Sequence, residues 1–263
     1  MKKNGFTLVE ILIAISLIGV VAALTLPNMT RNLQVAELQA QFNKTYADLN
    51  DFAVYFKSRH SMTLPYWASM YGTDYQQRFI QYHSKTSATT GNIYTNMQTD
   101  KGKESLKKYT RRALTNATGT GTLGSLCDAS AYIEDNIGRI YSFDDNPPRG
   151  YNGPRVCVDI NGAKKPNTWG LDVFSFLFTV DGSVIPEGEY NKYSNLYENE
   201  YQSPDGKIKI GPAWAAQTTV GPSKCYAHYA GQTCAYYAAE NKSPKDETKT
   251  YWKDFVGKKQ YLK

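Results

Sequence analysis

The sequence predicts an α+β fold in which one long N-terminal helix forms a stem and packs against an antiparallel β-sheet in a globular head. An apolar run of membrane length is followed by an amphipathic pattern at helical spacing, which predicts the stem. Later stretches of alternating or apolar residues are separated by short turn signals, which favours consecutive antiparallel strands. From these patterns we expect a leader (1–5), a stem helix (6–57, membrane-spanning over 6–26), a helical and loop insertion (58–122), a β-rich head (123–240) and a polar C-terminal tail (241–263).

The first half of the stem is an apolar run from Phe6 to Leu26, interrupted by one acidic residue. As a helix this run is about 30 Å long, which matches the hydrocarbon core of a bilayer. Lys2 and Lys3 precede it without a nearby acid and favour a cytoplasmic N-terminus. Glu10 lies inside the run, and because an ionised carboxylate in hydrocarbon costs several kcal/mol, its presence indicates a specific role.

The string Gly5-Phe-Thr-Leu-Val-Glu10, between a basic leader and an apolar run, resembles the N-terminal cleavage and methylation segment of type IV pilins and pseudopilins. The resemblance covers roughly residues 1–35. It implies that prepilin peptidase cuts after Gly5 and that Phe6, the new first residue, is N-methylated. It also implies that Glu10 pairs with the N-terminal amine of a neighbouring subunit during assembly.

This resemblance implies a pilin-like architecture and a structural subunit, not an enzyme, of a type IV pilus or a type II secretion pseudopilus. The two systems stay open. The implied partners are other pilin or pseudopilin subunits, prepilin peptidase and the inner-membrane assembly platform, and no cofactor is implied. The implied location is the bacterial inner membrane, single-pass with the head outside the cytoplasm, and then the pilus or pseudopilus.

Three other interpretations of the N-terminus fit less well. A secretory signal peptide would need small residues for cleavage after its apolar region, and Ala22-Ala23-Leu24 meets that need only loosely. A plain signal anchor fits the length and the basic flank but leaves Glu10 unexplained. A lipoprotein is excluded because no cysteine precedes Cys127.

The second half of the stem is expected to pack on the head. Pro27 should kink or locally open the helix without ending it, because it removes one N–H and clashes with the preceding turn. Apolar residues then recur at a spacing of three or four up to about Lys57. They include Leu33, Val35, Leu38, Phe42, Tyr46, Leu49 and Phe52.

All four cysteines lie in the head, and an even count in an exported domain favours two disulfides. Cys225 and Cys234 are close in sequence and would close a small loop, which leaves Cys127 with Cys157. Four cysteines allow three pairings, so the connectivity stays open. The spacings do not match a zinc site.

The strongest strand signal is Leu171–Val180, followed by the turn signal Asp181-Gly182 and a short partner, Ser183–Pro186. Arg155–Ile160 alternates and predicts a further strand. Lys207–Ile210 is a candidate hairpin strand. Short turns between such strands predict an antiparallel sheet against which the amphipathic half of the stem packs.

Two stretches of the insertion are expected to be helical, Tyr75–Tyr82 and Lys103–Leu114. On a helix, the basic residues of the second stretch would share one face: Lys107, Lys108, Arg111 and Arg112. That face is either a solvated surface or a patch for DNA or an acidic glycan, with Tyr94 and Tyr109 as stacking groups. The second interpretation gives the alternative function, a minor tip pilin for adhesion or DNA uptake. The net charge of +6 does not by itself indicate nucleic acid.

The loop from Asp159 to Asp172 carries oxygen ligands of the kind that calcium accepts, with Asn161 and Asn167 between the two carboxylates. The positions do not fit an EF-hand, and the alternative is an Asx-type turn before the next strand. No catalytic motif is present. The aromatic residues of the tail either dock on the head or belong to a disordered end: Tyr251, Trp252, Phe255 and Tyr261.

Overall fold

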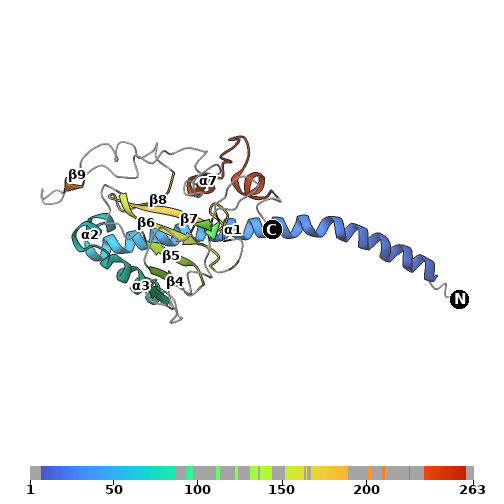
Figure 1. The fold of residues 1–263 in the computed structure, drawn as a ribbon, viewed down its shortest axis with the longest axis horizontal. Helices are drawn as coiled ribbons and strands as arrows, with labels where there is room; N and C mark the ends of the chain where they lie inside the picture. Colours follow the sequence, from blue (N-terminus) through green and yellow to red (C-terminus); the bar gives the residue numbers. More distant parts are fainter. Residues whose placement is uncertain are drawn as a thin grey trace.

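In a computed structural model of the protein, the described residues are 7–86, 93–96, 111–112, 122–123, 131–135, 137–143, 152–162, 164, 167–188, 201–202, 209–210, 225 and 234–258. The longest element is α1 (Leu8–His60), a single continuous helix. Figure 1 shows its N-terminal half projecting away from the head, while its C-terminal half lies along the sheet. The predicted stem is therefore confirmed, and it ends three residues later than expected.

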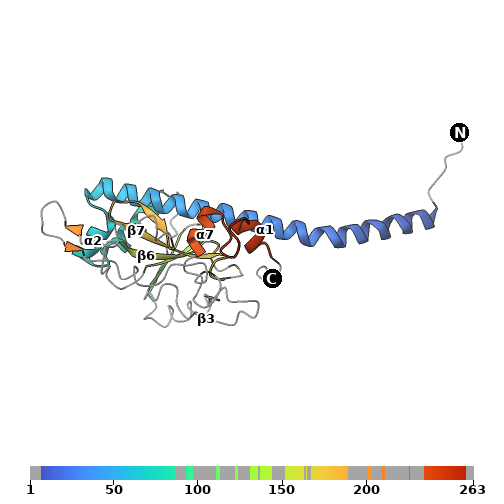
Figure 2. The ribbon, with the colours of Figure 1, turned by 90° about the horizontal axis from the view of Figure 1, so that it is seen from above.

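The two halves of α1 differ in burial. Large apolar side chains from Leu8 to Leu33 are exposed, whereas buried positions begin at Val35 and recur every three or four residues. The buried set is Val35, Leu38, Phe42, Thr45, Leu49, Phe52, Ala53 and Phe56. The helix continues through Pro27, and Figure 2 shows a gentle bend along the projecting half. The sequence predicted that Pro27 would not end the helix, and this prediction is confirmed.

The main sheet has six strands in the order β1-β4-β5-β6-β7-β8, and every neighbouring pair is antiparallel. The strands are β1 (Ile93–Asn96), β4 (Ala131–Glu134), β5 (Ile140–Phe143), β6 (Asn152–Asp159), β7 (Val173–Thr179) and β8 (Val184–Pro186). The predicted strands at β6, β7 and β8 are present, with the Asp181-Gly182 turn between the last two. Strand β1 was not expected and lies within the stretch assigned to the insertion.

One face of β7 packs directly on the stem. Because successive strand residues face opposite sides, Phe174, Phe176 and Phe178 share a face. The rings of Phe174 and Phe176 lie 4.7 and 5.7 Å from that of Phe42, and the ring of Phe178 lies 6.0 Å from that of Phe52. Aromatic burial of this kind contributes a large share of core stability.

Two further helices, α2 (Leu64–Tyr71) and α3 (Asp74–Thr86), complete the core beyond the end of the stem. Phe79 of α3 is fully buried, and its ring lies 5.0 Å from that of Tyr141 and 5.1 Å from that of Phe143 on β5. The helix expected at Tyr75–Tyr82 is thus confirmed within α3. It belongs to the same core as the sheet.

The helix expected at Lys103–Leu114 is wrong at the two residues that can be checked. Arg111–Arg112 forms a short strand, β2, paired antiparallel with β3 (Thr122–Leu123). Pairing with a partner further along the chain overrode the local helical pattern. Lys107 and Lys108 lie outside the described residues. A second small pair, β9 (Tyr201–Gln202) with β10 (Lys209–Ile210), contains the predicted hairpin strand.

The C-terminal part of the chain docks on the head beside the stem. It contains helix α7 (Cys234–Glu240) and a π-helix, η2 (Tyr251–Val256). Tyr251, Trp252 and Phe255 are buried, and Figure 1 and Figure 2 show these red segments where α1 enters the head. The aromatic residues supply the apolar surface that holds this lysine-rich segment in place. Tyr261 lies outside the described residues.

Candidate functional site

The N-terminal end of α1 carries a capping box built from Thr7 and Glu10. The Thr7 hydroxyl accepts from the Glu10 backbone N–H at 3.3 Å, while Glu10 Oε2 accepts from both the backbone N–H and the hydroxyl of Thr7 at 2.7 Å. Two N–H groups at the start of the helix are thereby satisfied. Gly5 and Phe6 lie outside the described residues, so cleavage and methylation there stay predictions.

This geometry gives Glu10 a definite position in the single chain. Its carboxylate is held at the helix N-terminus, on the side of the chain that leads to Phe6, where the helix dipole also favours negative charge. An N-terminal ammonium on the residue before Thr7, from the same chain or a neighbour, would meet an oriented acceptor. The T-x-x-E spacing was visible in the sequence but its capping role was missed.

The projecting half of α1 presents an unusually large apolar surface for a single chain. Leu8 is 75% exposed and Ile18 is 68% exposed, and the described part of the chain contains one helix, α1, that is long and apolar enough to cross a membrane. Exposed apolar surface of this extent requires a bilayer or other apolar helices to cover it. Among the described residues, Glu10 is the only acidic group between Leu8 and Leu33.

A buried ionic cluster joins the stem to the head. The Arg139 guanidinium donates to Asp48 of α1 at 2.7 Å, to Asp135 at 2.6 Å and to the Thr45 hydroxyl at 3.3 Å. Burial raises the pKa of Tyr141 well above its usual value, so the phenol stays protonated and donates to Asp135 at 3.2 Å. These bonds fix the β4–β5 turn against one side of the stem.

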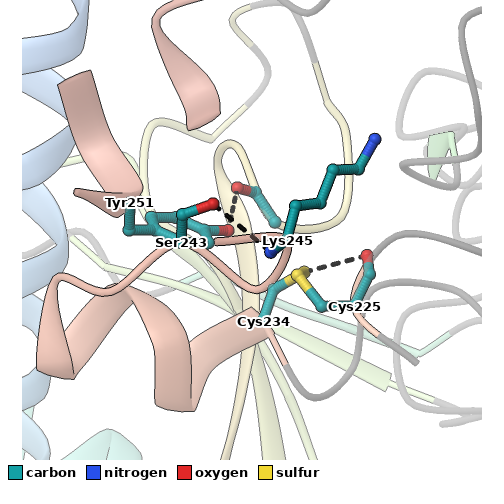
Figure 3. Close-up of a disulfide and its surroundings, with 6 residues drawn as sticks. Cys225, Cys234, Ser243, Lys245 and Tyr251 are labelled. Carbon is teal, nitrogen blue, oxygen red and sulfur yellow. Dashed lines mark hydrogen bonds between the residues drawn. A yellow bond between two sulfur atoms is a disulfide. The ribbon is translucent and has the colours of Figure 1, made fainter. Parts of the chain in front are cut away.

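A disulfide joins α7 to the preceding segment. Cys225 and Cys234 are bonded, with Cα atoms 4.6 Å apart, and Figure 3 shows them beside Tyr251. The Tyr251 hydroxyl donates to the Gly170 carbonyl at 2.5 Å. A Cβ at Gly170 would lie 2.7 Å from Cys234 Sγ, and φ there is +78°, so glycine is required at this close approach.

Of the second predicted disulfide, Cys127–Cys157, only Cys157 is among the described residues. Cys157 is fully buried on β6 and is disulfide-bonded. Cys127 lies outside the described residues, so its pairing with Cys157 stays a prediction.

In the loop from Asp159 to Asp172, the second carboxylate bonds to the backbone of the loop. Asp172 is buried, and its carboxylate accepts from the backbone N–H groups of Asn167 at 2.7 Å and Thr168 at 2.5 Å. With its amide nitrogen turned inward, Asn167 donates to the Gly162 carbonyl at 3.1 Å. The side chains of Asp172 and Asn167 therefore bond to the backbone of the loop and stabilise its conformation. No three His, Cys, Asp or Glu side chains gather as a metal site would need within the described residues.

The comparisons with known proteins match the N-terminus. Residues 1–26 match the family model described as the prokaryotic N-terminal methylation motif, which is the signal of type IV pilin and pseudopilin precursors. No curated protein and no solved structure matches the chain. The predicted resemblance is confirmed over these residues, and the motif indicates a structural subunit rather than an enzyme.

Proposed function

We propose that the protein is a structural subunit of a type IV pilus or a type II secretion pseudopilus. It is made as a precursor, inserted into the inner membrane with its head outside the cytoplasm, and cut after Gly5 by prepilin peptidase. Phe6 is then N-methylated, and the subunit assembles with other pilin or pseudopilin subunits through the apolar half of its stem, on an inner-membrane assembly platform.

The observation that carries this proposal is the exposed apolar half of α1 behind a methylation motif. The head buries the stem only from Val35 onward, so the preceding helix has a continuous apolar surface with no cover in the single chain. In a bilayer lipid would cover it, and in a filament other copies of the same helix would do so. An apolar helix of this kind can therefore lie in the bilayer before assembly and in the filament afterwards.

The capping box supports a role for Glu10 in setting the register between neighbouring subunits. A charge buried without its partner among apolar helices costs more than the pair gains, so pairing with a neighbour's N-terminal ammonium would select one stagger between subunits. Thr7 holds the carboxylate at the helix start, where the ammonium at Phe6 would be generated.

Cleavage can be tested by expressing the full chain with and without a prepilin peptidase and sequencing its N-terminus. We expect cleavage between Gly5 and Phe6 only with the peptidase. Gly5→Val should remain uncut but membrane-inserted, and the neighbouring control Asn4→Ala should be cut normally. Peptidase-independent cleavage after Ala22 or Ala23 would instead indicate an ordinary signal peptide and contradict the proposal.

A further inference from the structure

Strand β8 (Val184–Pro186) is the last strand of the main sheet in the part of the chain that the structure describes. The outer edge of such a strand carries backbone N–H and C=O groups that can pair with a strand of another molecule. Copies of a chain that share a membrane or a filament meet often, so the partners of this edge decide whether heads can associate through it.

Both outward backbone groups of Val184 are bonded to the stem. The Ser183 carbonyl accepts from the Thr179 N–H at 3.0 Å, which directs Ser183 towards β7. Since successive residues of an edge strand direct their backbone groups to alternate sides, those of Val184 point away from β7. The Val184 N–H donates to Asn50 Oδ1 at 3.1 Å, and its carbonyl accepts from the Tyr46 hydroxyl at 3.1 Å. Two side chains of α1 thus take the place of a neighbouring strand.

These two side chains are held in the orientation that the edge requires. Asn50 Nδ2 donates to the Tyr46 carbonyl at 2.9 Å, which leaves the amide oxygen directed at Val184. The Tyr46 ring stacks on that of Phe176, with centroids 5.7 Å apart and planes 16° apart. Tyr46 and Asn50 are one helical turn apart, so they lie on the same side of α1.

The rest of the edge is closed by other means. Pro186 has no N–H to donate. The carbonyl of Glu187, directly after β8, accepts from the Tyr236 backbone N–H of α7 at 3.2 Å. Short length, proline and covering segments are the features by which proteins protect sheet edges from pairing, and β8 combines them.

We propose that Tyr46 and Asn50 keep the edge of β8 closed to a second copy of this chain. Without them, two heads would pair antiparallel through β8, and main-chain bonds between the copies would replace the bonds to the stem. The contact thereby prevents association between heads. This role concerns the head alone and holds whether or not the chain forms filaments.

The test measures amide hydrogen exchange by mass spectrometry on the full chain in detergent micelles, in the peptide that covers 182–187. Asn50→Ala removes the acceptor of the Val184 N–H and opens space beside it. We expect exchange in this peptide to become about tenfold faster at low protein concentration. Asn43→Ala is the matched control at an exposed position of the same helix and should exchange as the wild type does.

Concentration separates edge protection from a purely structural role. In Tyr46→Phe/Asn50→Ala, which keeps the ring on Phe176, exchange in the same peptide should slow again as the protein concentration rises, because a second copy then covers the edge. Unchanged exchange in Asn50→Ala, or faster exchange that does not depend on concentration, would overturn the proposal. If the double variant loses protection throughout β6 and β7, the concentration series on Asn50→Ala decides in the same way.

Discussion

The rings of Phe42 and Trp252 lie 5.6 Å apart and join the stem to the C-terminal π-helix. Both side chains are buried, and both also contact Phe174 of β7, at 4.7 and 5.9 Å between ring centroids. The Trp252 indole N–H donates to the Ala238 carbonyl of α7 at 3.1 Å. One side chain thus connects stem, sheet and C-terminal helix at the point where the stem enters the head.

Trp252→Ala should therefore destabilise the protein and release the C-terminal segment. Removing a buried tryptophan costs about 3–5 kcal/mol, through lost burial and a residual cavity. Guanidinium unfolding of the full chain in detergent would measure the free energy, and limited proteolysis would show cleavage within 243–258. Lys253→Ala, an exposed neighbour on η2, should change neither readout. Equal stability of the two variants would contradict this role for Trp252.

Arg139→Met should destabilise the protein because it leaves the buried Asp135 carboxylate without its cation. Breaking a buried ion pair from one side costs about 3–5 kcal/mol. Lys44→Ala removes an exposed partner 4.0 Å from Asp48 and should cost about 1 kcal/mol or less. The same unfolding measurement compares the two variants. A loss below about 1 kcal/mol for Arg139→Met would show that the cluster does not hold the β4–β5 turn.

His83 should make stability fall in acid. Burial lowers its pKa from 6.5 to about 4; the charge of Arg139 adds to this lowering, while Asp135 and Asp48 raise the pKa by smaller amounts. Between these values the unfolded chain binds the proton and the folded chain does not, so this contribution is complete above pH 6.5 and is lost as the pH falls towards 4. The slope from this group is at most about 1.4 kcal/mol per pH unit.

The matched variant is His83→Phe, because Phe79 and Tyr141 already surround this position with aromatic rings. Unfolding free energies measured from pH 4 to pH 7 should vary less steeply in the variant than in the wild type. Carboxylates titrate in the same range in both proteins, so the difference between the two slopes isolates His83. Identical slopes would show that His83 is not the group responsible.

Glu10 can be tested for pairing and for capping separately. Glu10→Val and Glu10→Gln should both insert into the membrane, and both should assemble poorly because neither supplies a negative charge for the N-terminal ammonium. Glutamine still serves a capping box, so Glu10→Gln keeps the bonds to Thr7. The measurement is the ratio of subunit in sheared filaments to subunit in membranes. If Glu10→Gln assembles as well as the wild type, the role of Glu10 is capping and not pairing. If Glu10→Val also assembles as well as the wild type, neither role is needed for assembly.

The sequence predicted the parts of the fold that depend on local patterns. The stem and the strands at β6, β7 and β8 follow from apolar periodicity and from the Asp181-Gly182 turn. Arg111–Arg112 was expected within a helix at Lys103–Leu114, but β2 depends on its partner β3, which a local pattern does not reveal. Strand β1 was missed because β4, its partner, comes much later in the chain.

The candidate sites likewise divide into those made of contiguous residues, which the sequence reveals, and those assembled from distant segments, which it does not. Gly5, Phe6 and Glu10 form a contiguous motif and could be found directly in the sequence. The Arg139 cluster combines the stem with the distant β4–β5 turn, so its geometry exists only in the folded chain. A Cβ at Gly162 would lie 1.9 Å from the Gly138 carbonyl oxygen, and no local pattern in the sequence reveals this close approach.

We propose that the apolar stem serves assembly after processing at Gly5. Mass spectrometry can test this on the N-terminal peptide of the chain recovered in the filament fraction of cells that carry the assembly system. We predict a peptide that begins at Phe6 and carries one methyl group on its α-amine. A chain found only in membranes, or one in filaments with its leader intact, would contradict the account.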